Sequence, residues 1–439
     1  MDYTINEVLQ FIMENDVKFI RLCFCDIFGT LKNISIIADE LPRAFDSGIS
    51  FDASSVNGFL NIEESDLFLY PDPSTLSILP WRPQQGRVAR FFCDIKYYDG
   101  TPFEGDCRFI LKKAIDAAAK YDYKVEIGSE CEFYLFELDE NGNPTKKPHD
   151  YAGYFDMAPL DKGENVRREI CLTLEQMGII PESSHHEQGP GQNEIDFKYS
   201  DSLSAAENLV TFRSVVKTIA QLNGLHASFM PKPLKNNGGS GLHINMSILK
   251  NGINLFDNMQ HDRAREAENF IAGILNRIRE ITVFLNPLTN SYERFGSHSA
   301  PKYITWSSQN RSQLIRIPAA SGKYSRMEIR SSDPCCNPYL TFALLIYAGI
   351  EGIETNSDLC EPENANLYDT SIELTRKYEM IPDTLDKAIN LAANSEFVKN
   401  HLPDKTLEKY IAAKQNEWNK YAMAENKEEH EQKSYFYIF

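Results

Sequence analysis

The clearest strand-like pattern in the chain covers residues 125–136, where polar positions alternate with apolar ones. Side chains two residues apart on a strand point to the same face, so Glu130 and Glu132 share one face while Cys131 points to the opposite, apolar face. Paired like charges repel each other and lose hydration on burial unless something positive lies between them. The pattern therefore predicts a strand that holds a divalent cation.

The first hundred residues predict a small module of one short helix and several strands. Thr4 with Glu7 resembles a capping box ahead of a helix over residues 8–14. Strands are expected at 19–24 and at 88–93, with turns rich in proline and aspartate between them. We expect the module to end within residues 100–106.

The remainder alternates predicted helices with strands. Asp106 is a suitable N-cap for a helix that reaches residue 121. Ser204 with Glu207 favours a second helix, which stops at Gly224 because glycine readily adopts the left-handed conformation of a helix end. Apolar residues repeat at helical spacing over 270–284 and predict a buried helix.

Two further helices are expected near the carboxyl end. Asn337 followed by Pro338 has the N-cap and N1 signature of a helix over residues 339–353. The acid-rich tail, 425–431, is most simply the solvated face of another helix.

Composition excludes several classes of partner. The chain has 439 residues and a net charge of −18, enough length for one large or two medium domains. An acidic chain without a basic block argues against nucleic acid and anionic membranes as partners. No apolar run is long enough to span a membrane, and the amino terminus lacks an export signal. The odd number of cysteines does not suggest a disulfide framework. We expect a cytoplasmic protein.

More metal-ligating residues occur in three later clusters. Glu187 and Glu194 flank a turn of glycine and proline, His243 follows the glycine-rich stretch 238–241, and Glu328 lies between two arginines. Carboxylates with a single imidazole suit Mg²⁺ or Mn²⁺. Because six protein ligands are too many for one catalytic Mg²⁺, we expect two ions.

These clusters, in this order, resemble the type I glutamine synthetases. The resemblance extends from about residue 17 to residue 368, and the matching stretches are 71–72, 101–106, 230–233, 286–292, 310–312 and 333–334. It implies an α+β fold, in which a β-grasp-like domain over 1–100 precedes an α/β catalytic domain over 101–439 with a helical carboxyl-terminal region.

The resemblance also implies a reaction, the ATP-dependent ligation of ammonia to L-glutamate through γ-glutamyl phosphate. A carboxylate is a poor electrophile, and phosphorylation by ATP activates it while metal ions neutralise the phosphate charge. The ion nearer the glutamate would be held by Glu132, Glu187 and Glu194. The ion on the nucleotide phosphates would be held by Glu130, His243 and Glu328.

Arginines suit both anions because their planar forks bind carboxylate and phosphate oxygens in pairs. By resemblance, the glutamate would be bound by Arg294, Arg330 and Gly239. The phosphates would be bound by Arg311, Arg316 and Arg326. The rest of the nucleotide would be contacted by Glu182, Asn245 and Ser247.

The resemblance places the ammonium ion between subunits. The loop at residues 51–55 is similar to a family loop that reaches into the neighbouring subunit's site, so Asp52 and Ser55 would join Tyr154 and Glu187 around the cation. This implies a homo-oligomer, similar to a dodecamer of two hexameric rings. An Asx-turn at Asp52 and Ser54 is the simpler reading of the same residues.

The flap departs from the family pattern, as do Gly238, where the family usually has asparagine, and Asn61, where regulated relatives commonly have arginine. Ser299 stands where the family flap carries a glutamate that accepts a proton from ammonium, and His298 precedes it. Loss of a general base costs about 10²- to 10⁴-fold in rate, so synthesis is expected to be slow unless His298, whose ordinary pKa is near neutral, takes over.

Two alternatives to ammonia ligation stay open. A γ-glutamyl ligase for an organic amine would share the fold and the metal site, although Asp52, Ser55 and Tyr154 favour ammonium. A weakened binding or regulatory relative is the second, and Ser299 is its main support.

Overall fold

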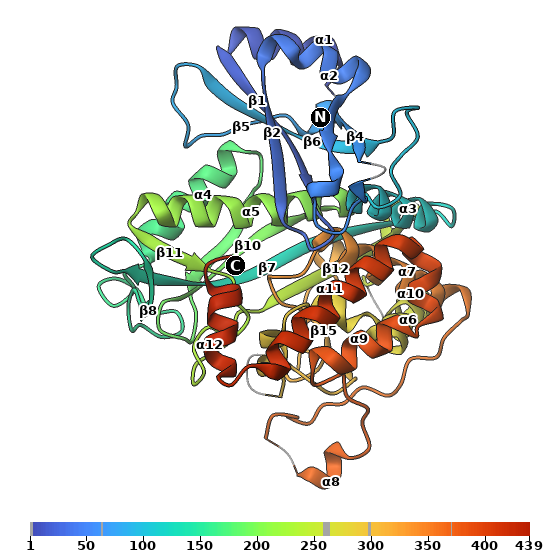
Figure 1. Ribbon diagram of the computed structural model, residues 1–439. Helices are drawn as coiled ribbons and strands as arrows, with labels where there is room; N and C mark the ends of the chain where they lie inside the picture. Colours follow the sequence, from blue (N-terminus) through green and yellow to red (C-terminus); the bar gives the residue numbers. More distant parts are fainter. Residues whose placement is uncertain (1–2, 63–64, 258–263, 297–299, 370) are drawn as a thin grey trace.

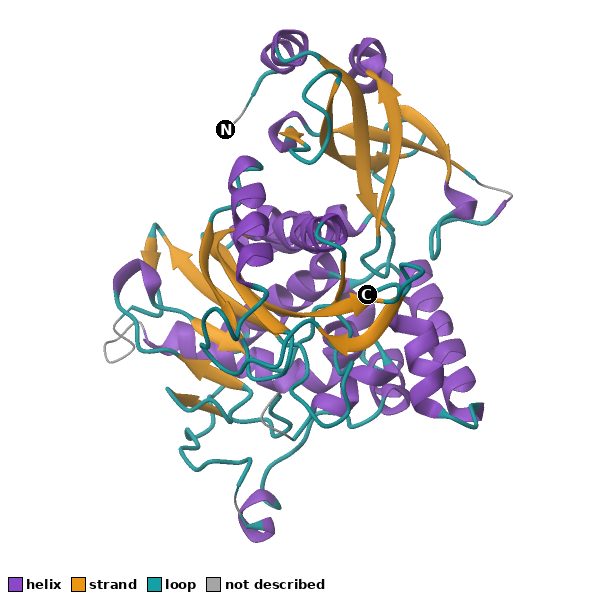
Figure 2. Cartoon of the chain, turned by 90° about the vertical axis from the view of Figure 1, so that its left-hand side faces the viewer, coloured by secondary structure: helices purple, strands orange, loops and turns teal. Residues whose placement is uncertain are grey.

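The computed structural model describes residues 3–62, 65–257, 264–296, 300–369 and 371–439 (Figure 1). A small amino-terminal part lies above a larger part built on a second sheet, and a layer of helices separates the two sheets (Figures 1 and 2). The predicted α+β class is confirmed. Within the described residues, no helix is both long and apolar enough to cross a bilayer.

The amino-terminal sheet has six strands in the order β2-β1-β6-β4-β3, with β5 paired to β6. β1 and β6 are parallel, and the other pairs are antiparallel. The strands are β1 (Val17–Cys25), β2 (Leu31–Ile37), β3 (Ile49–Asp52), β4 (Asp66–Pro71), β5 (Ser77–Ile78) and β6 (Arg87–Lys96). Helices α1 (Ile5–Glu14) and α2 (Leu41–Ser47) lie at the top of Figure 1, on the side away from the larger part.

The larger sheet has ten strands among the described residues, with a main path of β14-β15-β16-β12-β7-β10-β9. Its long central strand, β7, also pairs with β8 and β11, and β12 pairs with β13. The strands are β7 (Tyr123–Leu138), β8 (Pro144–Pro148), β9 (Pro181–His186), β10 (Gln192–Asp201), β11 (Leu225–Ser228), β12 (Leu242–Lys250), β13 (Ile253–Asn254), β14 (Trp306–Ser308), β15 (Ile315–Ile317) and β16 (Met327–Ile329).

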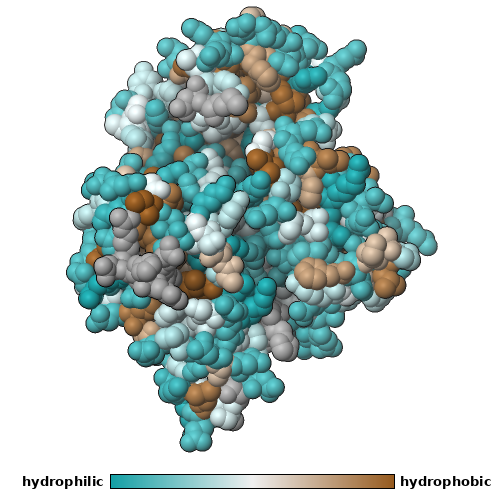
Figure 3. All heavy atoms as spheres, turned by 180° about the vertical axis from the view of Figure 1, so that it is seen from behind, coloured by the Kyte–Doolittle hydropathy of each residue, from teal (hydrophilic) through white to brown (hydrophobic). Residues whose placement is uncertain are grey.

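Helices surround this sheet on one side and at one end. Those between the sheets are α3 (Cys107–Ala119), α4 (Glu164–Gln176) and α5 (Ser202–Leu222). The remaining helices are α6 (Ala264–Leu285), α7 (Pro338–Glu354), α8 (Ile372–Thr375), α9 (Leu385–Ala393), α10 (Glu396–His401), α11 (Asp404–Met423) and α12 (Lys427–Glu431). Two short helical turns matter below, η5 (Thr289–Arg294) and η7 (Gln432–Phe436). Seen from behind, the surface is mostly hydrophilic, and apolar residues form small scattered patches (Figure 3).

Most helix starts follow the predicted caps. Thr4 and Glu7 form the expected capping box, although α1 begins earlier, at Ile5. Asp106 caps α3, and Asn337 caps α7, in each case by accepting a backbone N–H hydrogen bond. Side-chain oxygens at these positions satisfy N–H groups that have no partner within the helix.

One prediction for a helix cap is wrong, and the prediction of a solvated tail helix fails at one residue. α5 is capped by Asp201 rather than by Ser204, because the Asp201 carboxylate accepts from the Ser204 N–H and a negative charge is favoured at a helix start. The acid-rich tail does form α12, but its last residue, Glu431, is buried rather than solvated because it bonds to two residues of η5.

An ion network joins the two parts of the molecule. Arg108, on α3, is only 4% exposed and contacts three carboxylates. Its Nε donates to Glu207 on α5 at 2.7 Å, an Nη donates to Asp72 at 2.5 Å, and the other Nη contacts Asp94 on β6. The three acids compensate for burial of the guanidinium, and through them Arg108 connects Asp72 and Asp94 of the amino-terminal part to Glu207 on α5.

Candidate active site

A cavity of about 1500 Å³ opens beside strands β7, β9, β10 and β12 of the larger sheet. Carboxylates, imidazoles and arginines all line it. Of the residues that the sequence indicated, the cavity is lined by Glu130, Glu132, Tyr154, Glu187, Glu194, Gly239, His243, Arg311, Arg316, Arg326 and Arg330.

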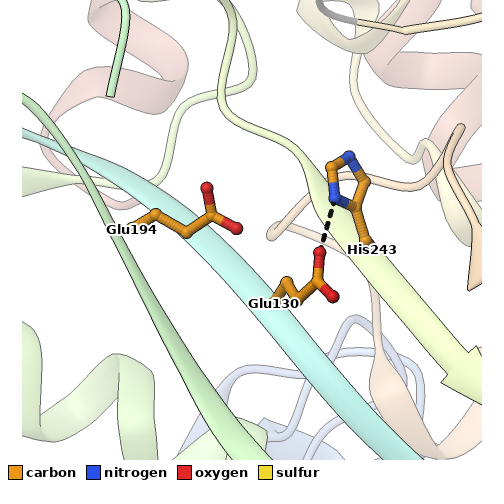
Figure 4. Close-up of side chains that lie close together, drawn as sticks. All are labelled: Glu130, Glu194 and His243. Carbon is orange, nitrogen blue, oxygen red and sulfur yellow. Dashed lines mark hydrogen bonds and ion pairs between the residues drawn. The ribbon is translucent and has the colours of Figure 1, made fainter. Parts of the chain in front are cut away.

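Strand register brings the first metal-ligating group together. Glu130 on β7 is the register partner of His243 on β12, and Glu132 is the partner of Glu194 on β10. The His243 Nδ1 lies 3.0 Å from a Glu130 oxygen (Figure 4). Ligand atoms of Glu130, Glu194 and His243 all lie within 4.8 Å of one another.

A second group shares Glu194 and adds His185, which the sequence patterns did not single out. The His185 Nε2 is 3.6 Å from Glu194, and its Nδ1 is 3.9 Å from Glu187. The rings of Tyr154 and Phe155 pack edge-on against this imidazole. His185 lies two residues before Glu187, and this alternation is the signal that could have revealed it.

The pKa values of the carboxylates in this cluster are shifted in different directions. Burial, together with the nearby Glu187, raises the pKa of Glu132, and burial with Asp196 raises the pKa of Glu194 well above its ordinary value. Burial would also raise the pKa of Glu130, but the His243 imidazole and the Asn245 amide lower it to about 2. Four carboxylates within one cluster repel, and their oxygens with imidazole nitrogens fit a hard or borderline divalent ion.

Glu328, the sixth predicted ligand, is fully buried behind this cluster. One of its oxygens contacts Arg316 and the other contacts Arg330, and the oxygen that contacts Arg330 is 3.5 Å from the His243 Nδ1. Burial tends to lower the pKa of Arg330, but the Glu328 charge outweighs it and the pKa is raised. The Glu328 carboxylate therefore connects Arg316 and Arg330 to His243 of the ligand cluster.

Asn245 connects another arginine, Arg326, to the ligand cluster. Its side-chain amide donates to Glu130 at 2.9 Å and accepts from the Arg326 Nε at 2.9 Å. Arg311, Arg316, Arg326 and Arg330 thus line the same cavity as the carboxylate cluster, and three of them are connected to it through Glu328 and Asn245. Such a cavity can hold an anion and its metal counter-ions side by side.

Gly239 and Arg294 meet at the edge of the cavity. A Cβ atom at Gly239 would lie 2.5 Å from the Pro231 carbonyl oxygen and 2.7 Å from the Arg294 Cγ, so only glycine fits there. Arg294 is fully buried, and its Nη1 donates to the carbonyl oxygens of Ser331 and Ser332. The arginine therefore lies directly behind the glycine.

Several predicted residues do not line this cavity. Asp52 and Ser55 are on the amino-terminal part, where Asp52 forms the alternative Asx-turn with the Ser54 N–H at 2.9 Å. Glu182 is exposed on β9, next to the cavity-lining Ser183. Ser247 lies on β12, where its hydroxyl donates to the Ser325 carbonyl oxygen at 2.9 Å. His298 and Ser299 lie outside the described residues.

Comparisons with known proteins agree with this architecture. The sequence profile of the glutamine synthetase catalytic domain matches residues 104–433, and that of the glutamine synthetase beta-grasp domain matches residues 16–98. A glutamine synthetase of Clostridium saccharobutylicum is 48% identical over 95% of this chain and 96% of its own length. One of Methanosarcina mazei is also 48% identical, over 95% of each chain.

Solved structures give the same result. A complex of GmaS with ADP shares 28% identity and superposes with a TM-score of 0.87 over 99% of both chains. Plasmodium falciparum glutamine synthetase shares 26% identity with a TM-score of 0.86 over 97% of this chain and 98% of that one. Fold and site together define a ligase. The chain belongs to the glutamine synthetase family.

Proposed function

We propose that this protein joins ammonia to L-glutamate at the expense of ATP, which is converted to ADP and phosphate, and that L-glutamine is the product. The observation that carries the proposal is the cavity in which the ligand cluster around Glu130 and Glu194 faces four arginines. The ADP bound to the structurally similar GmaS supports a nucleotide in this cavity. The proposed domains are residues 1–100 and 101–439, and the proposed location is the cytoplasm.

The residues present fit two Mg²⁺ or Mn²⁺ ions. In our proposal one is held by Glu132, Glu187 and Glu194, which line the cavity, and the other by Glu130 and His243 of the cavity with the buried Glu328 beside them. His185 is an additional candidate for the first, since it lies beside both Glu187 and Glu194. When bound, such ions neutralise charge on the phosphates and on the γ-carboxylate.

Arginines would orient both substrates for phosphoryl transfer. Arg294 and Arg330, with Gly239, would hold glutamate so that a γ-carboxylate oxygen attacks the γ-phosphorus of ATP and ADP leaves. The phosphates would be held by Arg311, Arg316 and Arg326, with Glu182, Asn245 and Ser247 around the nucleotide. The product of this step is γ-glutamyl phosphate.

Amide formation then needs ammonia rather than ammonium. Asp52 and Ser55 of a neighbouring subunit, together with Tyr154 and Glu187 of the cavity, would bind the cation, and the Asp52 carboxylate would accept its proton. Ammonia attacks the acyl carbon, and phosphate leaves with the former γ-carboxylate oxygen. His298 is the proposed substitute base for the flap glutamate that Ser299 replaces, and without such a substitute this step is expected to be slow.

A turnover assay with several amines tests the proposal directly. Purified protein with ATP, Mg²⁺ or Mn²⁺ and glutamate should release phosphate and form glutamine in equal amounts only when ammonium is supplied. Phosphate release and amide product are measured together for ammonium, methylamine and ethylamine. If amide formation is faster with an organic amine than with ammonium, that amine rather than ammonia is the substrate. Binding of ATP and glutamate without phosphate release would instead support the binding or regulatory role.

A subunit-mixing experiment tests the shared site. Asp52 lies on the amino-terminal part and does not line the cavity of its own chain. Asp52→Ala and Glu328→Gln subunits should each be inactive, but dissociating and reassembling them together should restore activity, because some interfaces then combine an intact Asp52 with an intact Glu328. Reassembly of each variant alone is the control. Verified mixed oligomers without activity would refute sites between subunits, and particle size by light scattering tests the proposed dodecamer.

A further inference from the structure

The buried end of α12 is connected to the candidate glutamate pocket. Glu431 is 6% exposed, whereas Glu428 and Glu429 on the same helix are exposed. One Glu431 oxygen accepts from the Thr289 hydroxyl at 2.7 Å, and the other accepts from the Asn290 side-chain amide at 2.9 Å. Burying a carboxylate costs free energy unless its oxygens are hydrogen-bonded, so the two contacts hold helix and turn together.

The first connection runs through Asn290 to the loop that carries Gly239. The Asn290 side chain accepts from the Lys232 backbone N–H at 2.6 Å and donates to the Lys232 carbonyl oxygen at 3.3 Å. The Lys232 ammonium in turn donates to the Asn237 carbonyl oxygen at 2.6 Å. Lys232, Asn237 and Gly239 all line the cavity, so Glu431 supports one wall of it.

The second connection runs through Thr289 to the arginine. Thr289 is the first residue of η5, and Arg294 is the last. The Tyr435 hydroxyl lies 3.1 Å from the Thr289 Oγ1 and donates to Glu417 on α11 at 2.6 Å, which ties this end of η5 to a long helix. The loop and η5 meet where Arg294 contacts the backbone at Gly239.

We propose that Glu431 is a positioning residue for glutamate: it fixes the 231–240 loop and η5 relative to each other, so that Gly239 and Arg294 keep their mutual placement. The inference rests on the proposed function, because it takes these two residues as the glutamate contacts. Both contacts of the Glu431 carboxylate are with η5, and one of them holds the Asn290 side chain that in turn bonds to Lys232 of the loop, so a single substitution removes both. A shift of about 1 Å in such a pair is enough to weaken binding strongly.

Kinetics of three variants on one helix test the role. Glu431→Ala should raise the glutamate KM by about tenfold while the ATP KM and the kcat at saturating glutamate change little. Glu431→Gln should remain close to the unmodified protein, since its amide oxygen can accept from Asn290 and its amide N–H can donate to the Thr289 hydroxyl. Glu429→Ala is the matched control, because this exposed acid pairs only with Lys433 among the ion pairs of the described residues.

The outcomes separate positioning from stability. If Glu431 only stabilised the fold, Glu431→Ala would lower kcat through a smaller active fraction and leave the glutamate KM unchanged, and this result overturns the inference. Should Glu431→Ala fail to fold, Thr289→Val removes one of the two contacts with little change of shape. A severalfold rise in its glutamate KM supports the inference, and an unchanged KM overturns it.

Glutamate binding separates this inference from the proposed function. If the unmodified protein forms no amide, the function proposal fails, and calorimetric titration of Mn²⁺-loaded protein with glutamate still decides the role of Glu431. Weaker glutamate binding by Glu431→Ala than by Glu429→Ala supports positioning, and equal binding overturns it. An unmodified protein that does not bind glutamate overturns both proposals.

Discussion

Replacing Glu130 by glutamine is expected to lower kcat by at least about 10²-fold while the protein stays folded. Glutamine fills the same space between His243 and Asn245, but it carries no charge, and its amide nitrogen cannot bind a cation. The proposed ion on the nucleotide phosphates should then be lost. Steady-state rates give the first readout, and calorimetric titration with Mn²⁺ should show one tight ion per subunit in place of two.

Glu126→Gln is the matched control for this experiment. Glu126 lies on the same strand and the same face as Glu130, but it pairs with Lys124 and does not line the cavity. Its substitution should change neither the rate nor the number of bound ions. A Glu130→Gln protein that still binds two Mn²⁺ ions with unchanged affinity would exclude Glu130 as a ligand.

The second large effect is expected on stability. Arg108→Met should reduce the free energy of unfolding by about 3–5 kcal/mol, because removing one partner of a buried ion pair leaves charge uncompensated, here on Asp72, Asp94 and Glu207. Equilibrium denaturation in urea measures the loss. Lys112→Met is the control, since Lys112 contacts Asp94 from a more exposed position on the same helix. Equal losses in the two variants would show that the network is unimportant.

Acidification should reduce the difference in free energy of unfolding between Arg108→Met and the unmodified protein. Burial would raise the pKa of Asp72, but the Arg108 charge and the hydrogen bond from Ser74 outweigh it and lower the pKa. A carboxylate with a lowered pKa contributes stability above its unfolded pKa of about 3.9, and this contribution is lost as the pH falls through the folded value. Urea titrations at pH 7 and near pH 3, below the unfolded pKa of about 3.9, should therefore give a smaller difference between the two free energies of unfolding at the lower pH.

The sequence was sufficient to predict which side chains of β7 share a face, because successive side chains on a strand point to opposite sides. Glu130 and Glu132 accordingly reach the cavity, and Cys131 is fully buried on the other face, as predicted. Helix caps were predicted nearly as well, since a cap depends on neighbours within four residues. The cap of α5 was misassigned because Asp201 and Ser204 are both good N-cap residues and sequence does not rank them.

Contacts between distant segments could not be predicted in this way. The Arg108 bond to Glu207 spans 99 positions, and the Glu431 bonds to Asn290 and Thr289 span 141 and 142. No local pattern distinguishes these charged side chains from exposed ones, and the burial that does so depends on tertiary packing. For the same reason, the resemblance to a family was needed to group the scattered arginines and carboxylates into a single site.

The distance between the two proposed ion positions is set by the spacing of residues along one strand, β7. Glu130 and Glu132 are separated by one pleat of β7, a step of about 6.7 Å along the strand, and their register partners His243 and Glu194 are fixed on the two flanking strands. Sheet hydrogen bonds set this length, so neither loop closure nor the radius of the ion can change it appreciably. Exchange of Mg²⁺ for Mn²⁺ or Ca²⁺ should alter side-chain rotamers and the number of coordinated waters, while the distance between the two ions stays nearly constant.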